Sequence, residues 1–386
     1  MNRNTSTAPG AVYIHIPFCT NKCHYCDFNS YVLKGQPVEE YLDALEREME
    51  RTVRQTPPGQ IETIFVGGGT PTVLLPAQME RFLRIVRTYF PQWSPSVEFT
   101  MEANPGTTDE EKLRVMKEGG VNRISFGVQS FDNGLLEGIG RIHTTDDVYR
   151  SLSNARAVGF TNLSIDLMFG LPHQTEQHMQ HTLDKALELD LPHYSIYSLK
   201  VEENTLFHTL YHRGQLPLPD EDSELGMFYL IMNRLREAGY GQYEVSNFAR
   251  PGFESRHNSA YWRNLDYYGL GAGAHGYVHG WRHINIKGVQ PYIDATRKGF
   301  PLLERFEVTR SEAMEDFMMV GLRLLEGVSN RDFSSQFGLR MEEIFAAPLE
   351  KLLQQELIEP TGADGYRLTP QGLVYGNEVF AEFLSE

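Results

Sequence analysis

The stretch IHIPFCTNKCHYCDF, residues 14–28, contains all three cysteines of the 386-residue chain. Their spacing, Cys19-x3-Cys23-x2-Cys26, lets one short loop present three thiolates to one face of a metal centre. Thiolate is a ligand of zinc and of iron–sulfur clusters. A structural zinc ion takes four protein ligands, and one loop supplying all four is unusual, although His15 and His24 are near in sequence. The spacing therefore favours a [4Fe–4S] cluster on three cysteines, with one iron open to a small molecule.

The cysteine loop follows the first of six apolar, β-rich segments, at residues 12–18, 63–68, 97–104, 123–130, 162–170 and 193–201. Helical periodicity lies between most of them, beginning after Pro37 and continuing at residues 76–89, 108–117, 144–158 and 175–189. Alternating strands and helices predict right-handed crossovers and a parallel sheet. Six such units predict an α/β fold, a partial (β/α)6 barrel rather than a closed eight-stranded one.

The pattern changes after about residue 220. A helix is expected at residues 223–237, and the Gly- and aromatic-rich segment that follows predicts loops and short strands. Helices at 311–325, 330–336 and 341–355, a hairpin at 362–368 and a final helix predict a C-terminal, mainly helical, winged-helix-like domain. The expected domains are residues 1–220 (partial barrel), 221–305 (β/loop extension with the HNSAYW motif) and 306–386. The acidic residues of the last domain favour a lid or interaction role over DNA binding.

Composition excludes several classes of partner. The net charge is −16, which argues against a nucleic acid, because phosphate backbones are bound by Lys and Arg. The N-terminal segment lacks the apolar region of a secretory signal, and no apolar run is long enough for an integral membrane segment. Three closely spaced cysteines do not make a disulfide framework. We expect a cytoplasmic protein.

Polar residues stand where the predicted strands end, which is where ligands bind in βα barrels. The run GGGTPT, residues 67–72, follows the second strand, and its glycines predict close backbone approach to a ligand, with N–H groups free to meet a carboxylate. Glu102 and Gln129 end the third and fourth strands, Asp166 lies in the fifth, and Arg141 offers a forked donor. Each of these residues by itself is as compatible with a structural role as with ligand binding. Their joint placement predicts a ligand site.

These motifs carry a family resemblance. YIHIPFC, CxxxCxxC, FVGGGTPT, EANP, GVQSF, GRIH and DLMFGLP occur in this order over residues 13–172. Together they resemble the coproporphyrinogen III oxidase-like branch of the radical S-adenosylmethionine (SAM) superfamily, which includes the HemW-type haem chaperones. The resemblance implies a [4Fe–4S] cluster on Cys19, Cys23 and Cys26. It also implies SAM contacts at Tyr13, Tyr25, Gly68, Gly69, Thr70, Glu102, Gln129, Arg141 and Asp166.

Two features separate the members of this branch. The decarboxylases resemble one another in carrying CxxxCxxCxC and a longer segment before it, whereas this chain has Phe28 at the position of the fourth cysteine. HemW-type proteins are similar to this chain in two respects. They have the sequence CDF at this position, and they carry an HNxxYW motif, which here is HNSAYW at residues 257–262. The resemblance implies that His257 binds haem. From spacing alone, a turn-capping His257 and a core Trp262 are favoured, and His275, His279 and His283 are weaker alternative ligands.

Three functions stay open from sequence. The favoured one is a haem chaperone that binds haem, a [4Fe–4S] cluster and SAM, and passes haem to an acceptor protein, for which a membrane-bound haem enzyme is one candidate. The second is an oxygen-independent coproporphyrinogen III oxidase, a radical SAM oxidative decarboxylase. The third is a zinc-stabilised interaction module. Whether the chain is an enzyme that cleaves SAM productively is not decided by the sequence.

Overall fold

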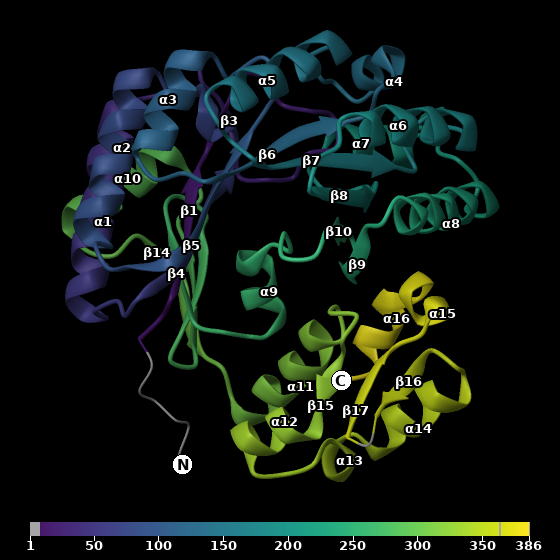
Figure 1. Cartoon of the computed structure of the whole chain (residues 1–386). Helices are drawn as coiled ribbons and strands as arrows, with labels where there is room; N and C mark the ends of the chain where they lie inside the picture. Colours follow the sequence, from purple (N-terminus) through teal and green to yellow (C-terminus); the bar gives the residue numbers. More distant parts are fainter. Residues whose placement is uncertain (1–7, 363, 386) are drawn as a thin grey trace.

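The computed structural model describes residues 8–362 and 364–385, and a curved sheet dominates it (Figure 1). Twelve strands follow the order β14-β13-β12-β11-β1-β4-β5-β6-β7-β8-β10-β9. The central strands are β1 (Ala11–Ile16), β4 (Ile61–Gly68), β5 (Trp93–Ala103), β6 (Arg123–Gln129), β7 (Asn162–Phe169) and β8 (His193–Ser198). The helices along this part are α1 (Val38–Gln55), α2 (Pro76–Tyr89), α3 (Glu110–Glu118), α4 (Asn133–Gly138), α5 (Thr145–Ala157), α6 (Glu176–Glu188), α7 (Leu206–His212) and α8 (Glu221–Glu237).

The six central strands are parallel neighbours, and helices follow them on the outside of the curve (Figure 1). This confirms the predicted α/β fold with its partial barrel. The strands form as the sequence predicts because they are apolar on both faces; in β6, for example, every residue except the terminal Gln129 is buried. The helices turn one apolar stripe inward, as α1 does with Leu42, Leu45 and Met49.

The sheet is wider than the six predicted strands. On one side β11 (Tyr267–Leu270) pairs with β1 in parallel, and β12 (His275–Val278), β13 (Trp281–Asn285) and β14 (Leu302–Glu307) continue antiparallel. On the other side β10 (Asn247–Ala249) and β9 (Gly241–Glu244) pair antiparallel after β8. The segment expected to be loops and short strands also contains two unpredicted helices, α9 (Arg256–Trp262) and α10 (Val289–Lys298). The strands β12 and β13, by contrast, match the prediction.

The C-terminal part packs helices around a small sheet. The sheet has the order β15 (Val328–Ser329), β17 (Gly365–Leu368), β16 (Ile358–Thr361). Around it lie α11 (Arg310–Gly321), α12 (Asn330–Phe337), α13 (Met341–Ile344), α14 (Ala346–Gln354), α15 (Pro370–Val374) and α16 (Gly376–Ala381). The mainly helical domain with a short hairpin is therefore present. The single helix expected at 341–355 is wrong: it divides at Phe345, because Pro348 has no N–H to continue the helical bonding.

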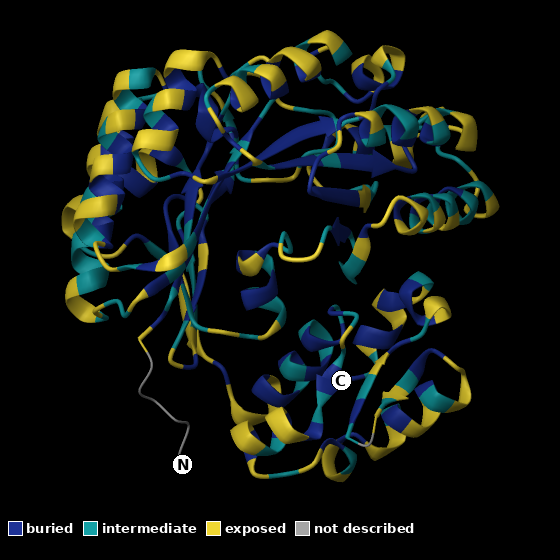
Figure 2. Cartoon of the chain, in the orientation of Figure 1, coloured by how far each residue is buried: buried dark blue, intermediate teal, exposed yellow. Residues whose placement is uncertain are grey.

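Buried apolar side chains form two large clusters. Figure 2 marks the buried residues in dark blue, along the sheet and within the C-terminal part. One lies between the sheet and its helices, and the other lies within the C-terminal part, from Val308 to Phe383, and includes Tyr277 of β12. The domain boundaries at 220/221 and 305/306 stay predictions. In the part of the chain that the structure describes, no helix is both long and apolar enough to cross a membrane.

Candidate functional site

Cys19 ends β2 (Phe18–Cys19), and Cys23 and Cys26 lie on the loop from there to β3 (Tyr31–Val32); each of the three is partly exposed. Burial, together with the neighbouring thiols Cys23 and Cys19, raises the pKa of Cys26 to about 11. Burial also raises the pKa of Cys19. A cationic centre would offset the raised pKa of Cys19 and Cys26, because only the thiolate is a ligand. The donor set therefore fits an iron–sulfur cluster.

The geometry of the loop bears on the choice between a cluster and a single ion. Over residues 8–362 and 364–385, no three His, Cys, Asp or Glu side chains are grouped as ligands of one metal ion. Cluster thiolates bind different irons and do not meet at a single point, whereas the ligands of zinc surround one atom. The spacing of the three cysteines, and not this absence, is what favours a multi-iron cluster.

Two hydrogen-bond donors point at the cysteine sulfurs, one just after β4 and one from the loop between α4 and α5. The Thr70 hydroxyl lies 3.6 Å from Cys19 Sγ, and Arg141 Nη1 lies 3.5 Å from Cys23 Sγ. Asn104 connects them: its Nδ2 donates to Thr70 Oγ1 at 2.8 Å, and its Oδ1 accepts from Arg141 Nη2 at 2.7 Å. Donors to sulfur stabilise a clustered thiolate and tune its potential. Sequence reasoning assigned Glu102 of EANP but missed Asn104, two residues later; an amide immediately after the strand was the available signal.

The predicted role of the glycine run needs correction. The N–H groups of Gly69 and Thr70 donate to the carbonyls of Ile16 and Phe18, and that of Gly68 donates to Glu102 Oε2. None of the three is free for a ligand carboxylate in this structure. The glycines instead allow close packing of the cysteine loop, because a Cβ on Gly69 would lie 2.6 Å from the Phe18 carbonyl oxygen.

Two of the predicted acids form a half-buried pair on the inner wall of the sheet. Glu102 on β5 and Asp166 on β7 flank β6, where Ser125 pairs with Glu102 in register and donates to Asp166 Oδ1 at 3.0 Å. Burial, together with the charge of Asp166, raises the pKa of Glu102 to about 8. Burial also raises the pKa of Asp166. At neutral pH Glu102 is largely protonated, so it can both donate and accept hydrogen bonds.

The remaining predicted residues surround this wall. Gln129 ends β6 with a left-handed φ of 69°, which turns its amide toward Gly127, beside Arg141. Tyr25 lies in the cysteine loop and packs against an apolar cluster that includes Met168 of β7. The structure therefore brings Thr70, Gln129 and Arg141 together near the thiols. Tyr13 lies apart from them, and its hydroxyl is 2.9 Å from His15 Nδ1.

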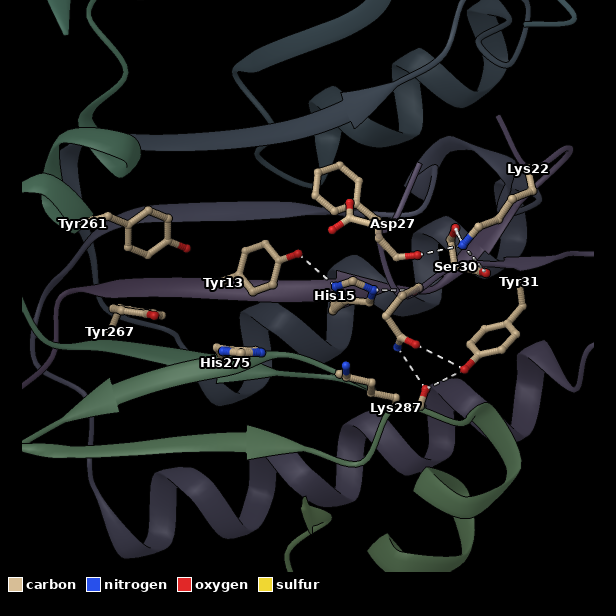
Figure 3. A pocket seen from close by; sticks show the side chains of 13 residues that line it. Tyr13, His15, Lys22, Asp27, Ser30, Tyr31, Tyr261, Tyr267, His275 and Lys287 are labelled. Atoms are coloured by element: carbon tan, nitrogen blue, oxygen red, sulfur yellow. Dashed lines mark hydrogen bonds between the residues drawn. The ribbon is translucent and has the colours of Figure 1, made fainter. Parts of the chain in front are cut away.

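A pocket of about 460 Å³ lies on the other side of the cysteine loop, between it and β11–β12 (Figure 3). We call it the tyrosine pocket. Of the predicted SAM residues, only Tyr13 lines it. Phe28, at the position of the fourth cysteine, is 61% exposed and faces it. Its lining residues are Tyr13, His15, Lys22, Asp27, Phe28, Asn29, Ser30, Tyr31, Tyr261, Tyr267, Gly273, His275 and Lys287.

His257 does not lie in this pocket. It is completely buried, its Nδ1 is 2.9 Å from Thr63 Oγ1, and its Nε2 is 2.8 Å from the Tyr261 hydroxyl. Burial lowers the pKa of His257 to about 3, so the ring is neutral. The expected turn-capping role belongs to Ser255, which accepts from Asn258 N at the start of α9. With both nitrogens paired, His257 is not positioned to bind haem iron in this arrangement.

Comparison with known proteins agrees with this architecture. Residues 13–186 match the radical SAM superfamily, and residues 308–375 match the HemN C-terminal domain. Coproporphyrinogen III oxidase (HemN) of Escherichia coli, described as a radical SAM enzyme, superposes with a TM-score of 0.85 at 25% identity, over 98% of this chain and 90% of that one.

Curated relatives decide between the branches. "Heme chaperone HemW" of Bacillus subtilis is 47% identical over 97% of this chain and 99% of its own length. The chain belongs to the HemW family. The Escherichia coli member is 37% identical over 98% of this chain and 99% of its own length. The family assignment agrees with the expectation drawn from Phe28 and HNSAYW, and the HemN-like alternative is not favoured.

Proposed function

We propose that this chain is a haem chaperone, which binds haem and delivers it to an acceptor protein. The single observation that carries the proposal is the 47% identity to "Heme chaperone HemW" over nearly the whole of both chains. The structure has, in the same region, three thiols, two half-buried acids and an adjoining aromatic pocket.

The cofactor set of the proposal is a [4Fe–4S] cluster on Cys19, Cys23 and Cys26, with SAM at its open iron. Thr70 and Arg141 would donate to the sulfurs, while Glu102, Gln129 and Asp166 would hold polar groups of the nucleoside. When bound, a cluster of low potential supplies an electron for reduction of the SAM sulfonium. Arg141 is well suited to a cluster, because its guanidinium is half-buried, stays charged and is held by two oxygen acceptors.

A coproporphyrinogen III oxidase is the alternative that shares most of this site. Phe28 argues against this alternative, because no thiol is present at that position and the phenyl ring faces the tyrosine pocket. We also propose a cytoplasmic location, an acceptor that is a haem protein such as a membrane-bound haem enzyme, and a helical region from residue 306 that acts as lid or interaction domain. Its acidic surface and separate core support that role.

One anaerobic preparation tests the proposal. The full chain is reconstituted with iron and sulfide and divided in two. One half receives ferric haem, and a saturable Soret band is expected at one haem per chain. The other half receives coproporphyrinogen III, SAM and a reductant, and no protoporphyrinogen is expected. Decarboxylation without haem uptake would establish the alternative and refute the chaperone.

A further inference from the structure

The tyrosine pocket combines features that suit a flat, anionic, iron-bearing ligand. Tyr13, Tyr261, Tyr267 and Phe28 supply aromatic surface, which packs on planar rings. Lys22 and Lys287 both line the pocket and supply positive charge, against the one carboxylate of Asp27 (Figure 3). The volume of about 460 Å³ lies within the range of small-molecule sites, roughly 300–1,000 Å³.

His275 is the side chain in this pocket best able to bind iron. It lies on β12, its side chain is exposed, and Figure 3 shows it between Tyr267 and Lys287. Within the described residues no hydrogen bond holds its ring. An imidazole nitrogen that is not engaged in a hydrogen bond is a common ligand of haem iron.

The other histidines near the site are already engaged. His15 Nδ1 contacts the Tyr13 hydroxyl, and its Nε2 is 2.8 Å from the Asn29 carbonyl. His283 Nε2 contacts the carbonyl of Gly269 at 3.0 Å. His257 reaches the pocket only through Tyr261, whose hydroxyl it holds. Breaking such buried pairs to bind iron would leave polar groups unsatisfied.

We propose that haem occupies the tyrosine pocket with His275 as its axial ligand, and that His257 is a positioning residue that fixes Tyr261 in the pocket wall. The inference rests on the proposed function and adds the place and the ligand. It also gives Phe28 a role: its ring is part of the haem site, two residues after the last cluster cysteine, Cys26. The contacts of Asn29 with Ala272 and Lys287 then join the cluster loop to the floor of the pocket.

The test is a titration of the full chain with ferric haem, read by the Soret band and by electron paramagnetic resonance. The variants are His275→Ala, His275→Met and His257→Phe. The matched control is His279→Ala, an exposed histidine near the other end of β12 that pairs with Asp266. Protoporphyrin IX without iron is titrated in parallel, because it uses the pocket but needs no axial ligand.

For His275→Ala we expect haem affinity to fall at least about tenfold, with a changed Soret maximum that added imidazole restores. His275→Met should give a different ligand signature. Affinity for iron-free protoporphyrin should change little. His257→Phe should weaken haem binding while the histidine signature at saturation remains, and the control should match the wild type.

Two results would overturn the inference while leaving the chaperone intact: haem binding to His275→Ala with unchanged affinity and spectrum, or loss of the histidine signature in His257→Phe alone. Absence of any saturable haem binding by the wild type would instead refute the proposed function, and the inference with it.

Discussion

His257 Nε2 lies 2.8 Å from the hydroxyl of Tyr261, one turn further along α9, and this contact joins a buried helix to the wall of the tyrosine pocket. The same imidazole stacks on Phe65 with ring centroids 5.3 Å apart, and Phe65 stacks on Tyr13. His257 thus sits between the sheet and the pocket. The HNSAYW motif therefore has a structural role that does not depend on which ligand the pocket binds.

His257→Phe should lower the free energy of unfolding by about 1–3 kcal/mol, because the Thr63 and Tyr261 hydroxyls lose their partner inside the protein. Urea denaturation followed by circular dichroism measures it. The control His279→Ala, at an exposed position, should stay within about 0.5 kcal/mol of the wild type. Equal stability of the two variants would contradict the described burial.

Gly69→Ala should disturb the cysteine loop, since its Cβ would meet three backbone atoms of Ile16 and Phe18 at 2.6–2.8 Å. Overpacking against backbone lowers the free energy of unfolding by about 1–3 kcal/mol. The iron content of the reconstituted protein should fall as well. Gly138→Ala is the matched control, because a Cβ there meets nothing within 4 Å. A Gly69→Ala protein with full iron content and unchanged melting temperature would count against this packing.

Arg141→Met should make the cluster harder to reduce. The change removes a positive charge and an N–H donor from Cys23 Sγ, both of which favour added electrons at the cluster. An anaerobic redox titration should give a more negative potential than the wild type. Arg114→Met, on the exposed face of α3 beside Glu110, should leave it unchanged. A potential that does not move would show that Arg141 is not a donor to the cluster.

Glu102→Gln should change how stability depends on pH. The folded pKa of Glu102, about 8, lies above its ordinary value of 4.5 because of burial and Asp166. Its stabilising contribution is therefore complete below about pH 4.5 and is lost as pH rises through 8.

The unfolding free energy of Glu102→Gln relative to wild type should consequently rise over that interval, by up to about 1.4 kcal/mol per pH unit, and then level off. Denaturation of the cluster-free protein between pH 5 and 9 checks this, with Glu118→Gln as the exposed control. A pH-independent difference would mean that Glu102 titrates normally.

The barrel was predictable because its strands and helices repeat a simple pattern. Buried parallel strands are apolar throughout, and helix α2 begins at the Pro76 that sequence reasoning chose. The short helix α9 could not be predicted, because seven residues give too little periodicity. The division of the helix at Phe345 could not be predicted either, because it depends on the single N–H that Pro348 lacks.

The site was predictable where a motif sets local geometry, and unpredictable where partners are distant. The cysteine loop and the strand-end acids follow from position in the sequence. The pairing of the Gly69 and Thr70 N–H groups depends on residues about fifty positions away, and no local signal shows it. The link from His257 to Thr63 likewise spans 194 positions.

The central claim, that the chain delivers haem rather than merely holding it, is tested most directly by transfer kinetics. The haem-loaded full chain is mixed with rising concentrations of a haem-free membrane-bound haem enzyme, and the rate of haem loss from the chain is followed by stopped flow. Handover through a complex predicts a rate that increases with acceptor concentration and exceeds the rate with apomyoglobin, a haem scavenger. A rate that is independent of the acceptor and equal to that with apomyoglobin would mean simple dissociation, and would contradict the account.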